Sequence, residues 1–189
     1  DQAAPPEAYD PTAHGGVTRV VLDARTLEKR SDNLVLTGTL RNCAGGASPW
    51  GWLSCEETSE VGHGYVFLCR TDAAKLSPPR KIASYGRFVH EAVCIDPATA
   101  IAYLTEDRDD GCLYRFLPNQ PSNPFEGKLQ ALKLAGRDGF DTATGMKARE
   151  KHAVSWVDVT TPDSPRDDLR MQARRAGAAR IRRGEGLSF

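Results

Sequence analysis

The sequence has no long hydrophobic run, which excludes a chain built around membrane-spanning helices. None of its segments approaches the roughly 20 consecutive apolar residues that such a helix needs. The N-terminal residues also lack the basic stretch followed by an apolar one that marks an export signal. We therefore expect no insertion into a membrane. A signal removed ahead of Asp1 would leave no trace, so the sequence by itself assigns no compartment.

An excess of charge of either sign is also absent. Lysine and arginine together number 25, as do aspartate and glutamate, so the formal net charge at pH 7 is zero. Proteins that bind the backbone of nucleic acids do so with positive charge that replaces its counterions. Without a net positive field, we do not expect a nucleic acid to be a partner of this chain.

Paired cysteine spacing is the third absence. The five cysteines are odd in number and form none of the close pairs of zinc ribbons or redox motifs, so at least one thiol is free or bound to another group. Cys69 and Cys94 lie in apolar strand patterns, where we expect each to be a small buried hydrophobic residue. Cys55 differs from them, because two carboxylates follow it.

What the sequence does contain is a series of short strands. Hydrophobic residues make up 40% of the chain and charged residues 26%, which suits one sizeable core in a soluble protein. Residues 1–16 are rich in Pro, Ala and Gly and predict an irregular N-terminal segment. Beyond it, aliphatic and β-branched residues between polar turns predict strands. These are residues 17–23, 34–40, 52–57, 65–70, 81–85, 91–96, 102–106, 113–117, 129–134 and 153–159.

The spacing of these strands predicts the fold class. No amphipathic helix interrupts the series up to residue 134, and the turns are tight, as at residues 109–111. Short strands of this kind form sandwiches, barrels or propellers, and repetition at about the length of a four-stranded blade favours a propeller. We therefore predict a mostly-β chain whose residues 17–189 form one β-propeller domain.

One helix is predicted near the C-terminus, over residues 165–181. Ser164 and Pro165 suit the N-cap and the first helical position, and Asp167 and Asp168 favour the first turn. Arginines crowd the later turns. They could form an anion-binding face, but a solvated helix face is the interpretation that we favour. The arginines concerned include Arg170, Arg174, Arg175 and Arg180.

The segment PWGWLSCEE, residues 49–57, is the first candidate for chemistry. Cys55, Glu56 and Glu57 place a soft thiolate and hard carboxylates together. Strand alternation puts Cys55 and Glu57 on one face and Glu56 on the other, unless a bulge turns all three inward. A thiolate with carboxylates suits an iron-like ion, whereas carboxylates and carbonyl oxygens suit calcium. A buried cysteine beside two solvated glutamates is an equally natural interpretation of these three residues alone.

Three other acidic motifs lie at or near strand ends: His90-Glu91, Glu106-Asp107 and Arg183-Gly184-Glu185. In a propeller the innermost strands line one channel, so acidic residues from different blades would converge there. Arginine could add a bidentate fork for phosphate oxygens. Each motif taken alone also fits a structural role, as a turn or as a helix end followed by an exposed glutamate.

Six motifs in order resemble those of the PhoX-type alkaline phosphatase family, and the resemblance extends from about residue 17 to the C-terminus. The motifs are RNCAGG at 41–46, PWGWLSCEE at 49–57, GRFVHE at 86–91, AYLTED at 102–107, LYRFLP at 113–118 and RGEG at 183–186. The resemblance implies a six-bladed β-propeller, a channel that holds iron and calcium, hydrolysis of small-molecule phosphate esters, export to the periplasm or beyond, and a monomer.

The resemblance also implies roles for individual residues. The expected iron ligands are Cys55, Glu91 and Glu185; the expected calcium ligands are Glu56, Glu57 and Asp107; and Asn42 and Arg183 are expected to hold phosphate as catalytic groups. Such a mechanism is metal-assisted and needs no serine nucleophile.

The length of the chain predicts that it is a fragment. At roughly 40 to 45 residues per blade, 189 residues cover about four blades, fewer than a closed six-bladed ring requires. Two other functions stay open from the sequence. One is a non-catalytic propeller that binds partners through its loops, and the other is a calcium-dependent hydrolase of another ester, such as a lactone.

Overall fold

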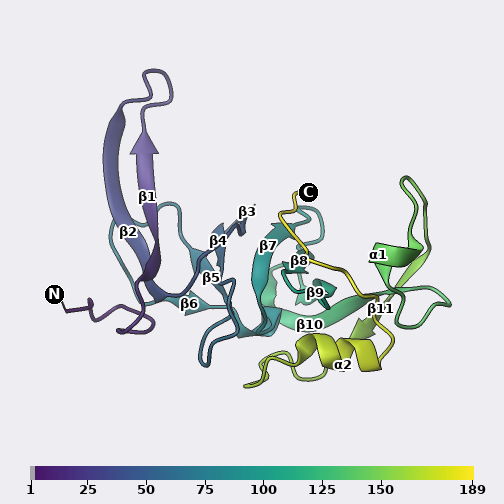
Figure 1. Cartoon of the computed structure of the whole chain (residues 1–189). Coiled ribbons are helices and arrows are strands. Elements are labelled where there is room, and N and C mark those ends of the chain that lie inside the picture. Colours follow the sequence, from purple (N-terminus) through teal and green to yellow (C-terminus); the bar gives the residue numbers. More distant parts are fainter. Residues whose placement is uncertain (1–2) are drawn as a thin grey trace.

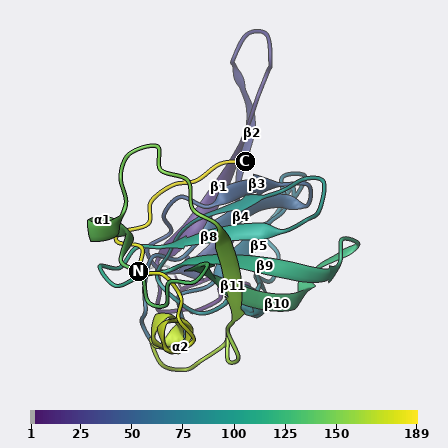
Figure 2. The ribbon, with the colours of Figure 1, turned by 90° about the vertical axis from the view of Figure 1, so that its right-hand side faces the viewer.

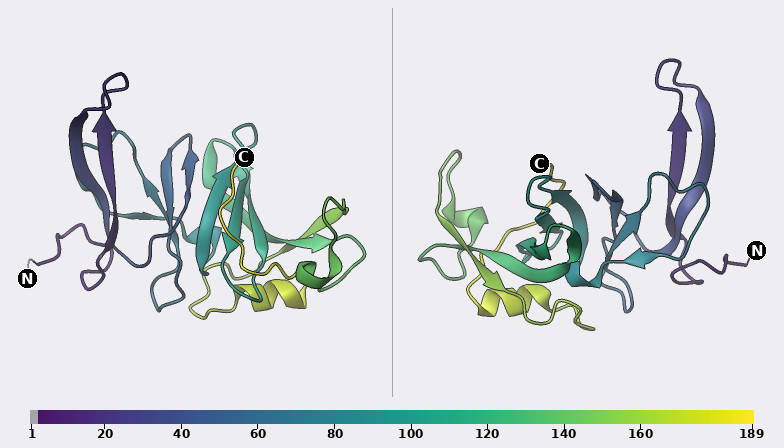
Figure 3. Two further views of the ribbon diagram at one scale, coloured as in Figure 1. Left: turned by 45° about the horizontal axis from the view of Figure 1, so that its top comes forward. Right: turned by 180° about the vertical axis from the view of Figure 1, so that it is seen from behind.

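The computed structural model describes residues 3–189, so Asp1 and Gln2 of the predicted N-terminal segment lie outside the described residues. Within this range the chain consists mostly of antiparallel β-strands in three sheets (Figure 1). This confirms the prediction of a mostly-β protein. The sheets follow one another along the chain and lie side by side (Figures 2 and 3).

The first sheet is a long hairpin of β1 (Gly15–Leu22) and β2 (Lys29–Thr39). Residues of β1 alternate between half-buried and exposed, as expected for a strand with one face on the protein and one in solvent. Its tip is a turn in which the Asp23 carboxylate accepts hydrogen bonds from the N–H groups of Arg25 and Thr26. The hairpin projects from the rest of the molecule (Figure 1).

The second sheet has the order β3-β4-β5-β6, with bounds Gly46–Ser48, Gly51–Cys55, Val66–Cys69 and Arg80–Lys81. The third has the order β11-β10-β9-β8-β7. Its strands are β7 (His90–Ile95), β8 (Ala102–Glu106), β9 (Leu113–Gln120), β10 (Asn123–Leu134) and β11 (Val154–Asp158).

The main hydrophobic core joins the second and third sheets to the C-terminal helix. Full burial of a large apolar side chain such as Leu104 or Phe116 contributes about 1.5–3 kcal/mol. The buried members of this core include Leu53, Val66, Tyr85, Val93, Leu104, Tyr114, Phe116 and Leu169. A second cluster, of Val35, Leu36, Tyr65, Phe67 and Cys69, attaches the hairpin to the second sheet. Cys69 and Cys94 are both buried, as the apolar strand patterns predicted.

Two glycines join the second sheet to the third. Gly45 forms a parallel bridge with Ala92, in which the Gly45 N–H donates to the Glu91 carbonyl at 3.2 Å. A Cβ on Gly46 would lie 1.8 Å from the Val93 carbonyl oxygen, so no other residue fits there without movement of the backbone. This close approach aligns the segment before β3 with the strand that carries Glu91.

Helical structure is short: a 3-10 turn η1 (Ala83–Tyr85), α1 (Thr142–Gly145) and α2 (Leu169–Arg175). The predicted helix over 165–181 is therefore too long at both ends. Pro165 begins a bend over residues 165–167, Asp168 is the N-cap, and Gly177, with a positive φ of 91°, follows the end of the helix. In the part of the chain that the structure describes, no helix has both the length and the apolar character needed to span a bilayer.

Most predicted strands are confirmed, with differences at the ends. Residues 81–85 form only the last residue of β6 and then η1, and β10 begins at Asn123 rather than near residue 129. β3 and α1 were not predicted. The sheets of residues 3–189 do not close into a ring, so a six-bladed propeller stays a prediction.

Candidate metal centre

Backbone hydrogen bonds bring five separate segments of the chain together. Cys43 N–H donates to the Cys55 carbonyl at 2.9 Å, and His90 N–H donates to the Glu56 carbonyl at 3.1 Å. Asp107 N–H then donates to the Val89 carbonyl, and Gly184 N–H to the Glu106 carbonyl, both at 3.1 Å. Residues 41–45, 55–57, 89–91, 105–108 and 183–185 therefore lie beside one another, although they are far apart in sequence.

Three of these segments place possible metal ligands close together. The Cys43 sulfur and one carboxylate oxygen each from Glu57 and Glu91 lie within 4.8 Å of one another. Glu91 is buried, Glu57 is half-buried and Cys43 is exposed, so the cluster is open to solvent on one side. A soft sulfur and hard oxygens at this separation can share one metal ion.

Further negative charge surrounds this cluster. Burial raises the pKa of Glu91, and the nearby carboxylates of Glu185, Glu57 and Asp107 raise it further. Burial and a hydrogen bond shared with Glu57 raise the pKa of Asp107. A hydrogen bond to Glu91, together with burial, raises the pKa of the Cys43 thiol to about 11. We call these five residues, Cys43, Glu57, Glu91, Asp107 and Glu185, the acidic group.

The acidic group fits a cation on electrostatic grounds. Without one, burial and the neighbouring negative charges raise the pKa values of Glu91 and Asp107, and the pKa of about 11 keeps the Cys43 thiol protonated at neutral pH. A bound cation would reverse that effect and favour the ionised forms. The mixed donors suit more than one kind of ion, because the thiolate favours a softer metal and the carboxylates a harder one.

Two arginines stand at the edge of the acidic group. Arg183 Nε lies 2.8 Å from Asp107 Oδ1, and Arg41 Nη2 lies 3.3 Å from Glu57 Oε2. Both side chains are largely exposed. Both residues have a positive φ, of 47° at Arg41 and 50° at Arg183, in the left-handed region that side-chain-bearing residues seldom adopt. Glu57 lies near enough to Asp107 to raise its pKa, so the two arginines flank a pair of neighbouring carboxylates.

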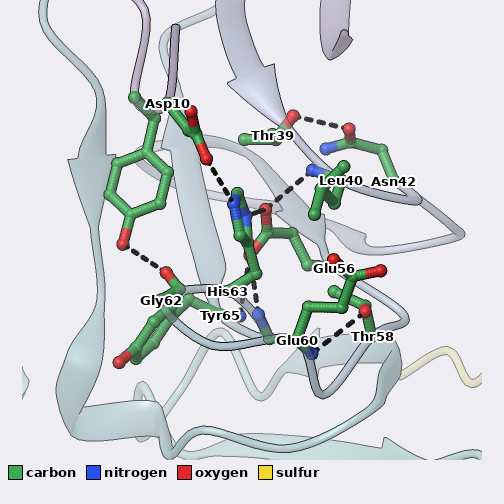
Figure 4. A network of polar contacts seen from close by, with 12 residues as sticks. Asp10, Thr39, Leu40, Asn42, Glu56, Thr58, Glu60, Gly62, His63 and Tyr65 are labelled. Atoms are coloured by element: carbon green, nitrogen blue, oxygen red, sulfur yellow. Dashed lines mark hydrogen bonds and ion pairs between the residues drawn. The ribbon is translucent and has the colours of Figure 1, made fainter. Parts of the chain in front are cut away.

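Glu56 points to the other side of its strand, as alternation predicts. Its fully buried carboxylate accepts hydrogen bonds from the N–H groups of Leu40 at 2.9 Å, Gly64 at 2.8 Å and Tyr65 at 3.2 Å. His63 Nδ1 lies 2.8 Å from the same carboxylate (Figure 4). The structure therefore does not bring this predicted calcium ligand into the acidic group, because protein donors occupy both of its oxygens.

Asn42 is also occupied by neighbours within the protein. Its Oδ1 accepts a hydrogen bond from Thr39 Oγ1 at 2.6 Å (Figure 4). Its Nδ2 donates to Ser54 Oγ at 2.9 Å. The side chain bridges the end of β2 and the strand β4. Both ends of the amide are thus engaged within the protein, and Ser54 takes one of the two Nδ2 hydrogens.

Cys55 lies behind the acidic group rather than in it. The side chain is completely buried, and burial first, then the charges of Glu91 and Cys43, raise its pKa. The thiol whose sulfur lies within reach of Glu57 and Glu91 is that of Cys43. Sequence reasoning chose Cys55 because carboxylates follow it directly. The available signal for Cys43 was its place in the RNCAGG motif, which pairs with the strand that carries Cys55.

The structure therefore brings together five of the eight predicted site residues: Glu57, Glu91, Asp107, Arg183 and Glu185. A large cavity of the protein is elsewhere and shares no residue with the acidic group. It has a volume of about 630 Å³ and lies along β1, against Trp52 and residues 69–71. Its lining is mostly apolar, so it does not offer an alternative set of metal ligands.

The fold and the acidic group together describe a β protein with a candidate metal centre, and comparison with known proteins gives its family. The family model described as alkaline phosphatase PhoX matches residues 20–189. The chain therefore belongs to the alkaline phosphatase PhoX family.

A solved structure is similar in fold. It is Pseudomonas fluorescens PhoX in complex with vanadate, a transition state analogue, with a TM-score of 0.58 and 18% sequence identity. The alignment covers 95% of this chain and 43% of that chain, so the chain spans less than half the length of this relative. The search of curated proteins gave no match to the sequence.

Proposed function

We propose that the acidic group binds metal ions and that the chain carries the site of a PhoX-type phosphomonoesterase. The observation that supports this proposal best is the convergence of the Cys43, Glu57 and Glu91 ligand atoms within 4.8 Å, in a chain of this family. We assign the thiol ligand to Cys43 and add Asp107 and Glu185 as further carboxylate ligands. A role for Cys55 as ligand stays a sequence prediction.

The donor set favours two kinds of ion. We propose an iron-like ion near the Cys43 thiolate and calcium among the carboxylates, because soft sulfur and hard oxygen prefer these metals respectively. When bound, such ions supply positive charge and Lewis acidity toward the oxygens of a phosphate ester. The protein residues then have to bind the substrate, orient it and balance its charge.

Arg183 and Arg41 are the residues that we assign to phosphate binding. Each guanidinium is exposed at the edge of the acidic group and can offer two parallel N–H donors to phosphate oxygens. The ion pair with Asp107 orients the guanidinium group of Arg183, and the ion pair with Glu57 orients that of Arg41. Asn42 remains a predicted phosphate contact, but the bridge that it forms between Thr39 and Ser54 supports a positioning role instead.

Other parts of the proposal rest on the family resemblance. We propose that residues 17–189 form part of a β-propeller, which has six blades in the family, and that the protein acts in the periplasm or outside the cell as a monomer. The substrate class is small-molecule phosphate esters. The balanced charge of the chain gives no support for a nucleic-acid substrate.

Metal analysis and an activity assay test the proposal together. The purified chain is expected to contain iron and calcium and to hydrolyse an aryl phosphate, and Glu91→Gln is expected to lose both properties. Calcium without phosphatase activity would favour hydrolysis of another ester. The absence of both metals, after the chain has been refolded with iron and calcium salts, would contradict the proposed metal centre.

A further inference from the structure

Arg170 is a buried charge that the proposed mechanism does not use. It lies on α2, and only 9% of its side chain is exposed, in contrast to Arg174 and Arg175 of the same helix, which are exposed. The sequence interpretation of these arginines as a solvated face is therefore wrong for Arg170. A buried guanidinium is stable only when it is paired, so its partners show what it holds in place.

The partners of Arg170 come from the loop that follows β8. Its Nε lies 2.9 Å from Asp110 Oδ1, and its Nη1 lies 3.7 Å from Glu106 Oε1. Nη1 also lies 2.7 Å from Oδ1 of Asp167, which precedes α2. The other oxygen of Asp167 is 3.0 Å from Nη2 of Arg108, which belongs to the same loop. Arg170 and Asp167 thus tie the helix to residues 106–110.

This loop in turn holds the C-terminal segment. The N–H groups of Ile181, Arg183 and Gly184 donate to the carbonyls of Gly111, Arg108 and Glu106, at 2.8, 2.9 and 3.1 Å. Arg180 adds a hydrogen bond from Nε to the Asp109 carbonyl at 2.9 Å. The position of the segment that carries Arg183 and Glu185 therefore depends on the conformation of residues 106–111.

Within the acidic group, Asp107 and Glu185 depend on this loop, whereas Cys43, Glu57 and Glu91 are placed by the second sheet and β7. We propose that Arg170 is a positioning residue for the metal centre: by fixing the loop 106–111, it sets Asp107, Arg183 and Glu185 against the other ligands. The inference rests on the proposed function, because the acidic group is the site that it positions.

Hydrogen exchange of the metal-free chain is the first test. Arg170→Met is expected to raise the exchange rates of the Arg183 and Gly184 amides about tenfold or more, while the amides of β1 and β2 keep their wild-type rates. Arg175→Met, on the exposed side of the same helix, is the matched control and is expected to change neither. Wild-type exchange at residues 183 and 184 in folded Arg170→Met would overturn the proposal.

Loss of a buried guanidinium leaves carboxylates unpaired, and Arg170→Met could fail to fold for that reason. Asp110→Ala is the milder variant, because it removes the acceptor of the Arg170 Nε hydrogen bond and leaves the pair with Asp167 intact. It is expected to raise exchange at residues 183 and 184 several-fold. Wild-type exchange rates at residues 183 and 184 in this variant would also contradict the proposal that Arg170 fixes the loop 106–111.

Calcium titration by calorimetry tests the link to the acidic group. Arg170→Met is expected to weaken calcium binding about tenfold, and to add little when it is combined with Asp107→Asn, because both changes act through Asp107. Fully additive losses would overturn the positioning role. If wild-type protein bound no calcium, the proposed function would fail, while the exchange experiment would still decide whether Arg170 holds the loop.

Discussion

Cys43 and Cys55 are twelve positions apart in sequence and are joined by a backbone hydrogen bond, yet their surroundings differ. Cys43 is exposed and its sulfur meets two carboxylates, whereas Cys55 is completely buried beneath them. A thiol needs access to the ion and partners at ligand distance, and only Cys43 has both. Two glutamates that follow a cysteine in sequence are therefore weaker evidence for a metal-binding thiol than the pairing of neighbouring segments in the fold.

The different surroundings of Cys43 and Cys55 lead to a testable prediction. Cys43→Ser is expected to weaken binding of Co²⁺, used as a probe ion, at least tenfold and to remove the sulfur-to-metal absorption band. Cys55→Ala is expected to lower the free energy of unfolding by about 1–2 kcal/mol, as for a small buried side chain, and to keep that band. Cys69→Ala controls for the loss of a buried thiol elsewhere. A band that is lost only in Cys55→Ala would restore the assignment made from the sequence.

Arg41 is the residue at the site that sequence reasoning passed over, although it begins the RNCAGG motif. Arg41→Gln is expected to weaken inhibition by inorganic phosphate about tenfold, because one charged fork at the edge of the site is lost. Calcium content should stay at the wild-type level, since no ligand is removed. Arg25→Gln, at the tip of the hairpin, is the matched control. Equal inhibition constants in Arg41→Gln and wild type would exclude Arg41 from phosphate binding.

At the scale of elements, the junction between the second and third sheets decides whether the site exists. Gly46 lies against the Val93 carbonyl, and Gly45 forms the bridge beside it. If this contact opened, Cys43 and Glu57 would separate from Glu91. The proposed metal centre thus depends on a position with no side chain of its own.

Gly46→Ala is expected to lower the free energy of unfolding by about 3 kcal/mol or more, because the added methyl group meets backbone rather than a movable side chain. Urea denaturation measures the change. Ala47→Ser, at the exposed neighbouring position, is expected to stay within about 0.5 kcal/mol of wild type. A fully stable Gly46→Ala would show that the two sheets can separate without cost.

The N-terminal segment is attached to the second sheet through His63. Its Nε2 lies 3.2 Å from Asp10 Oδ2 and its Nδ1 lies 2.8 Å from Glu56 Oε1 (Figure 4). Burial opposes the charged ring, but these two carboxylates outweigh it and raise the pKa of His63 above the ordinary value of 6.5. The folded protein thus favours the protonated ring, which joins two acidic residues.

This shift sets the sign of a pH dependence. The stabilisation is fully present below pH 6.5 and is lost as the pH rises through the raised pKa of folded His63. Burial raises the pKa of Glu106 to about 7, which makes stability fall with pH in the same direction. The free energy of unfolding is therefore expected to decrease more steeply above pH 6.5 in wild type than in His63→Gln. Identical slopes would show that His63 titrates normally in the folded protein.

At the scale of the whole molecule, the zero net charge conceals a local excess of negative charge in the acidic group. Calcium is expected to raise the melting temperature of the metal-free chain in a saturable way, by the equivalent of about 2.7 kcal/mol at a hundred times its dissociation constant. Glu91→Gln should melt at or above wild type in chelator, since one repelling charge is gone, and should respond weakly to calcium. A wild-type response in this variant would remove Glu91 from the site.

Much of the fold could be predicted from the sequence, because strands depend on local alternation and turns. The extents of β10 and α2 could not, since residues 176–181 leave the helix to hydrogen-bond with β10 and with loops distant in sequence. Of the predicted site residues, the structure brings Glu57, Glu91, Asp107, Arg183 and Glu185 together, and their role as a metal and phosphate site stays a prediction. Strand pairing, which a single sequence does not show, places the Cys43 thiol beside Glu57 and Glu91. It also turns the Glu56 carboxylate toward His63.

The left-handed backbone at Arg41 and Arg183 lowers the stability of the fold at the two positions that we propose to bind phosphate. Each such residue costs about 1 kcal/mol relative to glycine, which adopts this conformation freely. Laboratory evolution for heat resistance alone would therefore favour glycine at both positions. Such variants would keep the carboxylates that we propose to bind the ion and lose the two cationic groups that we propose to bind phosphate.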